Sequence, residues 1–384
     1  MFFGNIFKKN SKTTYGPMDA TFLIIVLILV ATGLIMMFSA SYANAYYLKN
    51  GNSTFYISKQ LVAAAIGFAA LMATSAIDHR IYRLLSIPIY VVTLALLVIV
   101  LFMRPLNGAR RWIFIGPINF QPSEIAKFAI VILFAAVICK CFNKMNSIVY
   151  GVLPFLAILA PVVVLMVMEP HLSGTILILA LGVIMMFIGG SPLWIFILGA
   201  IVVVGAIMAV IVNPDLLTVF TEYAGTRIEV WLNPASDPQG KGFQTLQSLY
   251  AIASGGLMGT CIGGSRQKYL YLPEPYNDFI FAIICEELGF VGAVLIICLF
   301  VLLIWRGFVI AARCPDKFGS LVAAGLTSQV GLQTILNIAV VTNTVPNTGI
   351  SLPFFSYGGT SLIMLMAEMG IILSISRITA IEKA

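Results

Sequence analysis

Long apolar stretches separated by short polar segments dominate the chain. A helix that crosses a bilayer needs about 20 predominantly apolar residues, and ten stretches of the chain meet this requirement. They are residues 20–42, 56–77, 83–103, 122–141, 149–168, 173–190, 193–212, 279–305, 319–341 and 353–376. The pattern predicts an all-α, polytopic membrane protein with ten transmembrane helices, which form a single transmembrane domain over residues 1–384.

One polar segment, residues 213–277, is much longer than the others. It contains an Asn-Pro pair, an Asp-Pro pair and several glycines, which are typical of turns. The segment is too short and too polar to fold around a core of its own. We therefore predict a structured extracellular loop with short amphipathic helices near 217–231 and 243–255.

The positions of Lys and Arg predict the orientation, because short loops rich in these residues stay on the cytoplasmic side. Basic residues such as Arg80 and Arg313 fall on the same side as the N-terminus, so both termini are predicted to be cytoplasmic. The first apolar stretch lacks a small-residue cleavage site and is interpreted as a retained helix. Arg110 and Arg111 fall in a short outer loop, against the usual charge bias.

Composition narrows the class of protein further. The chain is 60% hydrophobic and 10% charged, whereas a soluble domain has about 25% charged residues. This excludes an ordinary soluble enzyme and also a disordered chain. The net charge of +7 suits loops that meet anionic lipid headgroups, and no nucleic-acid partner is predicted. The six cysteines lack a convincing metal-binding spacing, so no metal site is predicted.

Charged side chains within or beside the apolar stretches are candidates for function, because they are costly in lipid. These residues are Lys59, Glu124, Lys127, Asp278, Glu286, Glu287 and Glu368. Asp278 stands where the long loop meets the eighth stretch. It could cap that helix, or it could act as a general base whose pKa is raised by apolar surroundings.

Two groups of residues with charged side chains lie at and before the start of the fourth stretch. Glu124 and Lys127 lie one turn apart on a helix, so they could pair with each other, or Lys127 could face a cavity that receives a phosphate. Arg110, Arg111 and Trp112 precede them. Anchoring at the membrane interface and binding of a pyrophosphate by two guanidinium groups fit this trio equally well.

A polar stripe marks the ninth stretch. Gln329, Gln333 and Asn337 recur every four residues and therefore share one face of a helix. Such a stripe is typical of hydrogen bonding between membrane helices, and it also suits the wall of a hydrated cavity.

The motifs together resemble the SEDS family (shape, elongation, division and sporulation) of bacterial membrane proteins. The matching motifs are Ser39-Ala-Ser41, Gly108-Ala-Arg-Arg-Trp112, Gln121-Pro-Ser-Glu124 with Lys127, Glu169-Pro170 with Gly174-Thr175, Ser265-Arg-Gln-Lys268-Tyr-Leu-Tyr-Leu-Pro273-Glu-Pro-Tyr-Asn-Asp278-Phe-Ile-Phe-Ala, Glu286-Glu-Leu-Gly289 and Leu352-Pro-Phe-Phe-Ser-Tyr-Gly-Gly-Thr-Ser361. They run in order over nearly the whole chain. The run that ends at Asp278, and Asn347-Thr-Gly349, are nearer to the FtsW and SpoVE branch than to RodA.

The resemblance implies a ten-helix fold and a peptidoglycan glycosyltransferase that polymerises lipid II on the outer face of the cytoplasmic membrane. It implies as partners a class B penicillin-binding protein, which is a transpeptidase, and other proteins of a division or elongation complex. The family's catalytic Asp maps onto Asp278. The residues expected to bind substrate are Arg110, Arg111, Trp112, Glu124, Lys127, Lys268 and Glu287. No tightly bound cofactor is implied, although a divalent cation such as Mg²⁺ could assist at the pyrophosphate.

One departure from the family pattern and two rival functions remain. The family often has His-Thr before its Asp, whereas this chain has Tyr276-Asn277. A lipid II flippase or transporter would spread its charged groups through the span, and Glu286, Glu287 and Glu368 are predicted to lie deep enough for that. A non-catalytic scaffold of the division complex would not need Asp278.

Overall fold

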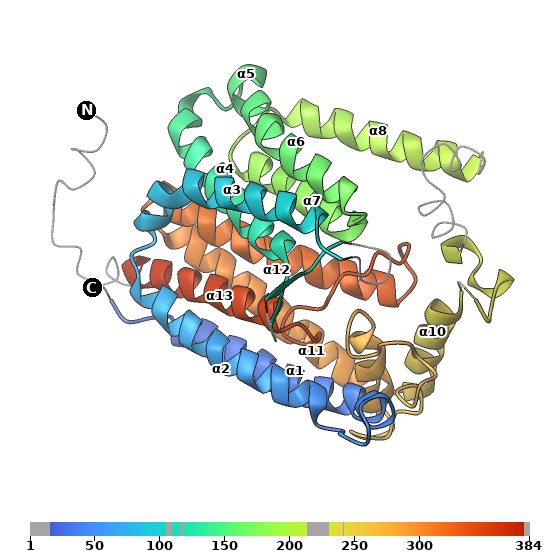
Figure 1. Ribbon diagram of the computed structural model, residues 1–384. Coiled ribbons are helices and arrows are strands. Elements are labelled where there is room, and N and C mark those ends of the chain that lie inside the picture. The colour runs from blue at the N-terminus through green and yellow to red at the C-terminus, as the bar shows by residue number, and fades with distance from the viewer. Residues whose placement is uncertain (1–15, 105–109, 116–117, 213–229, 241, 380–384) are drawn as a thin grey trace.

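The computed structural model describes residues 16–104, 110–115, 118–212, 230–240 and 242–379. Long helices form one bundle, and the loops around a short helix, α10, gather at one end of it (Figure 1). The helices are α1 (Ala20–Leu48), α2 (Phe55–Ala76), α3 (Arg80–Leu101), α4 (Pro122–Cys141), α5 (Ile148–Gly151), α6 (Leu153–Met168), α7 (Leu172–Ile188), α8 (Leu193–Val212), α10 (Phe243–Gly255), α11 (Ile280–Arg313), α12 (Lys317–Val341) and α13 (Gly359–Thr379).

The helices confirm the predicted positions of the spans. In the described part of the chain, eight helices are long and apolar enough to cross a membrane. The sixth predicted span corresponds to the shorter apolar helix α7, and the seventh to α8, which qualifies only as a shorter apolar helix over Leu193–Val202. The protein is therefore an all-helical, multi-pass membrane protein, and the count of ten crossings stays a prediction.

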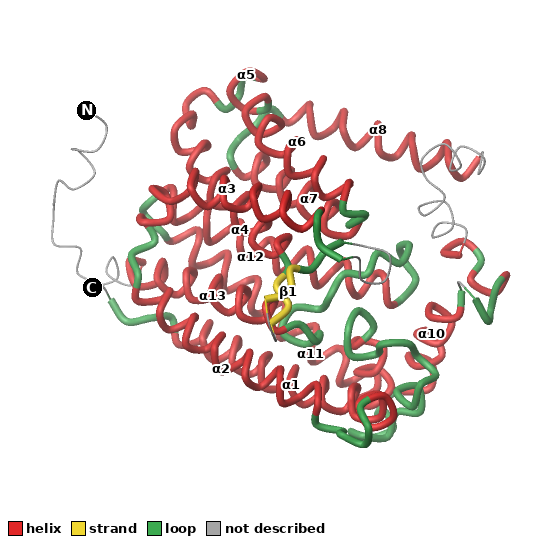
Figure 2. Tube along the Cα trace, in the orientation of Figure 1, coloured by secondary structure: helices red, strands yellow, loops and turns green. Residues whose placement is uncertain are grey.

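A small hairpin departs from the all-α prediction. Strands β1 (Ile113–Ile115) and β2 (Ile118–Phe120) pair antiparallel, with Ile113 opposite Phe120 (Figure 2, yellow). Their sequence has β-branched and aromatic residues on both sides of a Gly-Pro pair, which is a hairpin pattern. The hairpin leads directly into α4, and β2 contacts α13.

Two span boundaries differ from the sequence prediction for backbone reasons. Gly289 has φ 68°, a left-handed conformation that breaks α11 into a segment at 280–288 and a longer helix after it. The last span begins at Gly359 and not at residue 353, because residues 352–357 form a turn in which the Ser356 N–H donates to the Leu352 carbonyl. The predicted loop helix near 243–255 is confirmed as α10, whereas most of the one near 217–231 lies outside the described residues.

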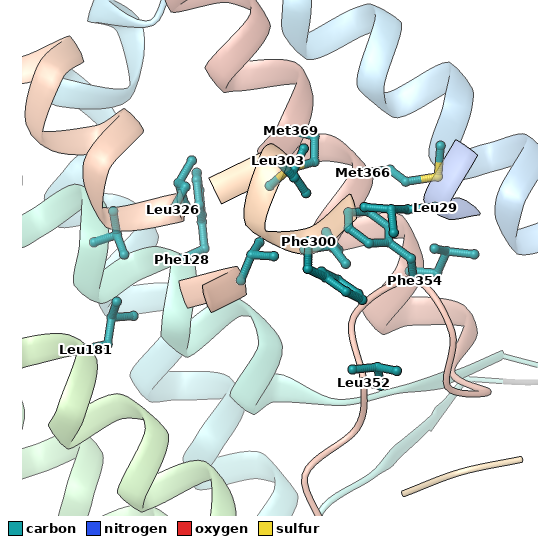
Figure 3. Packing of buried hydrophobic residues seen from close by; sticks show 14 of the residues in the cluster. Leu29, Phe128, Leu181, Phe300, Leu303, Leu326, Leu352, Phe354, Met366 and Met369 are labelled. Atoms are coloured by element: carbon teal, nitrogen blue, oxygen red, sulfur yellow. The ribbon is translucent and has the colours of Figure 1, made fainter. Parts of the chain in front are cut away.

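Polar residues decide which helices lie at the centre of the bundle. Lipid and protein core are equally apolar, so apolar periodicity cannot separate buried from lipid-facing sides. The helix α12 carries Gln, Asn, Ser and Thr side chains that need protein partners, and both α12 and α13 are buried over most of their length. Apolar packing continues between α1, α11 and the loop before α13, where Leu29, Phe300 and Phe354 meet (Figure 3).

Contacts between distant segments define one end of the bundle. The Asp19 carboxylate pairs with Arg306 at 2.8 Å, and the Gly16 N–H donates to the Arg377 carbonyl. The buried His79 ring, between α2 and α3, bonds to the Asp316 carboxylate, between α11 and α12, at 3.0 Å. These contacts place the start of α1 and the end of α13 together, as expected if both lie on the same side of the membrane.

Candidate active site

A cavity of about 1240 Å³ lies beside Asp278. Its walls come from α2, α4, α7, α12 and α13, from the residues around the hairpin, and from the loops before α11 and α13. Five of the eight predicted site residues line it, which are Arg111, Trp112, Glu124, Lys127 and Asp278. Segments as far apart in sequence as Ser58 on α2 and Leu365 on α13 thus meet at one site.

The backbone around Asp278 is fixed by three hydrogen bonds. The Asn337 amide donates to the Asp278 carbonyl at 2.7 Å, and the Ser356 hydroxyl donates to the Asn277 carbonyl at 2.7 Å. The Tyr357 N–H donates to the Tyr276 carbonyl at 2.8 Å. The N-cap position of α11 is Phe279, so Asp278 precedes the cap, and its half-buried side chain lies at the cavity wall.

Tyr276, which stands where the family often has His, packs into an aromatic cluster. Its ring lies 4.5 Å from that of Tyr56, and its hydroxyl donates to the Tyr56 hydroxyl at 3.1 Å. The Tyr357 ring meets both at near right angles. Tyr276 is buried, and burial raises the pKa of its phenol further above the ordinary value. It therefore supports the segment that carries Asp278 without supplying a proton.

Lys127 is buried in the cavity wall and is already paired. Its ammonium group lies 2.9 Å from the Glu124 carboxylate and donates to the Gln333 amide oxygen at 3.2 Å. Gln333 in turn donates to Ser351 in the loop before α13, at 3.1 Å. The two residues therefore pair with each other and also line the cavity, whereas the binding of a phosphate there stays a prediction.

The polar stripe of α12 has two roles. Gln333 lines the cavity, as one interpretation predicted. Gln329 donates to the Glu368 carboxylate at 2.8 Å, and Asn337 donates to the carbonyls of Asp278 and Ile350, as expected for bonding between membrane segments.

The two arginines before the hairpin point to different places. Arg111 lines the cavity, and its guanidinium group donates to the Pro170 carbonyl between α6 and α7. Arg110 is exposed and donates to the Leu101 carbonyl at the end of α3, so it does not line the cavity. Beside Arg111, burial raises the pKa of the Glu169 carboxyl to about 8, although the arginine charge opposes this.

Lys268 and Glu287 are brought together, but outside the cavity lining. The Lys268 ammonium lies 2.9 Å from the Glu287 carboxylate, and Ser39 on α1 donates to the same carboxylate at 2.7 Å. The neighbouring Glu286 accepts bonds from the Ser265 hydroxyl and the Arg266 N–H. This buried ionic cluster joins the long loop before α11 to α1 and α11, and neither Lys268 nor Glu287 lines the cavity.

Several cavity residues were missed by sequence reasoning. Ser123, His171 and Thr360 are buried in its wall, and each has a side-chain polar atom without a protein partner. Each lies inside or beside a motif that was already recognised. Position at a helix start within such a motif is the signal that could have found them.

The cavity extends to exposed apolar side chains of a spanning helix. Val62 and Ile66 on α2 line it and are 62% and 49% exposed. Ile363 on α13 lines the same region. An amphiphile could therefore place its headgroup near Asp278 and keep its tail in the bilayer.

The described residues do not form a metal site of their own. Among them, no group of three or more His, Cys, Asp or Glu side chains could hold a metal ion. The acidic residues that line the cavity are Glu124 on α4 and Glu274 and Asp278 in the loop before α11.

Comparison with known families and sequences gives a consistent result. Residues 19–381 match a family described as "Cell cycle protein", which groups FtsW, RodA and SpoVE. The chain is 40% identical to stage V sporulation protein E of Bacillus subtilis, over 94% of this chain and 97% of that one. It is 37% identical to a probable peptidoglycan glycosyltransferase FtsW of Trichlorobacter lovleyi, over 93% of each.

Solved structures show the same fold. A chain from a structure described as "Structural coordination of polymerization and crosslinking by a peptidoglycan synthase complex" superimposes with a TM-score of 0.76 at 30% identity, covering 94% of this chain and 98% of that one. The rod shape determining protein RodA of Thermus thermophilus gives a TM-score of 0.68 at 27% identity, covering 94% and 97%.

Proposed function

The chain belongs to the FtsW, RodA and SpoVE family of cell cycle proteins, and from this premise we propose that it polymerises lipid II into glycan strands. It is a peptidoglycan glycosyltransferase with a role in cell division or sporulation. We propose that it acts on the outer face of the bacterial cytoplasmic membrane. The observation that supports this proposal is the cavity itself, where Asp278, Arg111 and Lys127 share a wall that also reaches the lipid.

The proposed reaction uses Asp278 as the general base. Its carboxylate removes the proton from the 4-hydroxyl of an acceptor sugar, and that oxygen attacks the anomeric carbon of the lipid-linked donor. The bond from this carbon to the pyrophosphate breaks, and the polyprenyl pyrophosphate leaves with the bonding electrons. One carboxylate at the reacting centre suits inversion, since a retaining route uses a second one as nucleophile.

Positive groups on the cavity wall oppose the charge of the leaving group. Arg111 and Lys127 line the cavity and can stabilise the pyrophosphate as the bond breaks. A divalent cation such as Mg²⁺ would reach the site bound to the substrate pyrophosphate, because the described side chains offer no cluster to hold it. Titration of the polymerisation rate with EDTA and then Mg²⁺ tests this part of the proposal.

A partner protein fits the same proposal. The solved structure that this chain resembles is described as a peptidoglycan synthase complex that coordinates polymerisation and crosslinking. We propose a class B penicillin-binding protein as the crosslinking partner of this chain, within a division or elongation complex. Assays with and without that partner would show whether polymerisation needs it.

The rival functions predict other results. The flippase hypothesis drew on three glutamates expected deep in the span, but Glu286 and Glu287 bond to residues of the outer loop and of α1. Glu368 accepts a bond from Gln329 in the buried centre of the bundle. A scaffold would keep its function when Asp278 is replaced.

The first prediction is that Asp278→Asn abolishes polymerisation. Asparagine nearly preserves the volume but cannot accept the proton, and loss of a general base costs roughly 10²–10⁴-fold in rate. Purified protein in detergent is mixed with lipid II, and the glycan product is separated by gel electrophoresis. Asp237→Asn, at an exposed position of the outer loop, is the matched control. Polymer formation at the normal rate by a well-folded Asp278→Asn protein would exclude the proposed role.

A further inference from the structure

Besides the Nε atom of Arg111, three buried polar atoms of cavity-lining residues have no protein partner. They are the hydroxyl oxygens of Ser123 and Thr360 and the Nδ1 atom of His171. The three residues are 3%, 8% and 7% exposed. Buried polar groups are almost always hydrogen-bonded, so three such atoms on one wall indicate a bound polar species.

The three residues stand at the starts of three different helices. Ser123 is in the first turn of α4, His171 is the N-cap residue of α7, and Thr360 is in the first turn of α13. The N-cap side chains of α4 and α7 form no capping hydrogen bond. In α4, Pro122 has no N–H and the Glu124 N–H donates to the Gln121 carbonyl, so the Ser123 N–H and the first N–H groups of α7 are the ones without a side-chain cap. A helix start also carries partial positive charge.

A side-chain hydrogen bond brings the starts of α4 and α13 together, and both helices line the cavity with α7. The Ser361 hydroxyl, next to Thr360, donates to the Glu124 carboxylate, next to Ser123, at 3.2 Å. Burial and the charges of Arg111 and Lys127 lower the pKa of His171 to about 3, so its imidazole is neutral. Gly174 leaves room for that imidazole, since a Cβ on Gly174 would lie 3.0 Å from Nδ1.

The charges of the cavity do not suffice for a pyrophosphate. Its described lining has three basic residues, Lys59, Arg111 and Lys127, and three acidic ones, Glu124, Glu274 and Asp278, so the formal charges cancel. Lys127 is also already paired with Glu124 at 2.9 Å. Neutral donors at helix starts are a known means of binding a phosphate.

We infer that Ser123, His171 and Thr360 form a donor wall that binds the pyrophosphate of the lipid-linked substrate. The two hydroxyls and the imidazole N–H donate to phosphate oxygens, together with the Ser123 N–H at the start of α4 and the first N–H groups of α7 and α13. This inference rests on the proposed function for the identity of the substrate. The anion stays on this wall when the sugar–phosphate bond breaks, while Asp278 acts on the acceptor.

Binding to an inactive protein tests the donor wall directly. In the Asp278→Asn background, the protein in lipid nanodiscs is titrated with polyprenyl pyrophosphate and, separately, with the uncharged polyprenol. Ser123→Ala and Thr360→Val each remove one donor with little change in shape, and His171→Phe removes the ring nitrogens. A lost hydrogen bond to a charged group corresponds to about a tenfold loss of affinity. We expect this loss for the pyrophosphate and none for the polyprenol.

A matched control lies in the same cavity. The Ser58 hydroxyl already donates to the Phe55 carbonyl at 3.1 Å, so Ser58→Ala should bind both probes normally. Thermal unfolding of each variant shows whether it is folded, and His171→Gln serves if the phenylalanine variant is not. In the active background, the same changes should raise KM for lipid II more than they lower kcat.

The two proposals can fail separately. Normal pyrophosphate affinity in folded Ser123→Ala and Thr360→Val proteins would overturn the donor wall and would mean that these atoms hydrogen-bond to water. Pyrophosphate binding that depends on these residues, together with failure of the natural protein with Asp278 in place to polymerise lipid II, would keep the donor wall and overturn the proposed function.

Discussion

Gly349 controls the space available to the Asp278 side chain. It has φ 73°, and a Cβ added to it would lie 3.1 Å from the Asp278 Oδ2 atom. Gly349→Ala is therefore expected to strain the loop and to displace the carboxylate, with loss of roughly tenfold or more in kcat, because small misplacement of a catalytic group is costly.

Gly190→Ala separates these two effects. Gly190 has φ 86°, but a Cβ there would meet nothing within 4 Å. Both variants should lower the midpoint of thermal unfolding, while the polymerisation assay should show a slower rate for Gly349→Ala alone. Equal rates in the two variants would mean that the contact with Asp278 is unimportant.

Glu169 makes stability depend on pH. Burial raises the pKa of its carboxyl in the folded protein to about 8, above the ordinary 4.5. As the pH rises from the ordinary pKa of 4.5 to about 8, the unfolded chain releases the proton while the folded chain holds it, so the free energy of unfolding falls. Glu169→Gln cannot ionise and should remove this fall. Its advantage over the natural protein is therefore expected to grow between pH 5 and pH 8.

Scanning fluorimetry in detergent at several pH values measures this difference. Glu274→Gln, at an exposed carboxylate, is the control and should follow the natural protein. Parallel pH profiles for Glu169→Gln and the natural protein would show that Glu169 is ionised when folded.

The residue types of the site could be predicted, but not all of their surroundings. Asp278, Arg111 and Lys127 stand out because charge is rare in this chain and is costly in lipid. Ser123 and Thr360 do not stand out, because a hydroxyl is common in membrane helices and its partner decides its role. Lys268 and Arg110 carry charge as well, yet their partners lie away from the cavity.

At the scale of elements, the break in α11 links the outer loop to the bundle. Around Gly289, backbone N–H groups have no partner within the helix, and the loop supplies partners for them. The Phe290 N–H donates to the Gly256 carbonyl, and the Val291 N–H donates to the Leu257 carbonyl. The ionic cluster of Lys268 and Glu287 lies just before this break. We expect the cluster to hold the loop in place.

Lys268→Met tests the cluster. It leaves a buried carboxylate without its cation, which destabilises a protein by roughly 3–5 kcal/mol. We expect a lower unfolding midpoint and faster protease cleavage in the outer loop, with most of the stability restored in the double variant Lys268→Met, Glu287→Gln. Arg266→Met, at an exposed position in the same loop, is the control.

Kinetics distinguishes this structural role from the substrate-binding role that the resemblance implied. If Lys268 acts through the loop, KM for lipid II measured on folded protein should stay near normal. A raised KM without loss of stability would instead place Lys268 in contact with substrate.

Element positions were predictable because a span must be apolar over a fixed length. Breaks within elements were not, since the glycine of Glu286-Glu-Leu-Gly289 lies in a continuous apolar run. The hairpin was missed for a related reason, because its strands have three residues each and give no periodic signal.

At the scale of the whole molecule, contacts between distant segments separate the two ends of the bundle. Asp19 pairs with Arg306, and Gly16 bonds to Arg377, at one end, while the cavity lies near the loop before α11. The sequence indicated these groups through the charge bias of its loops. It could not show that α2, α4, α7, α12 and α13 share one cavity, because helix order in space depends on packing between equally apolar surfaces.

The lipid-facing side of the cavity, lined by Val62 and Ile66, determines which substrate concentration the enzyme experiences. A substrate that enters from the bilayer is counted per unit of membrane area and not per volume of solution. Dilution of a suspension of vesicles leaves that surface density unchanged, whereas addition of empty lipid or detergent lowers it. Turnover by this protein is therefore governed by how crowded the membrane is with its substrate.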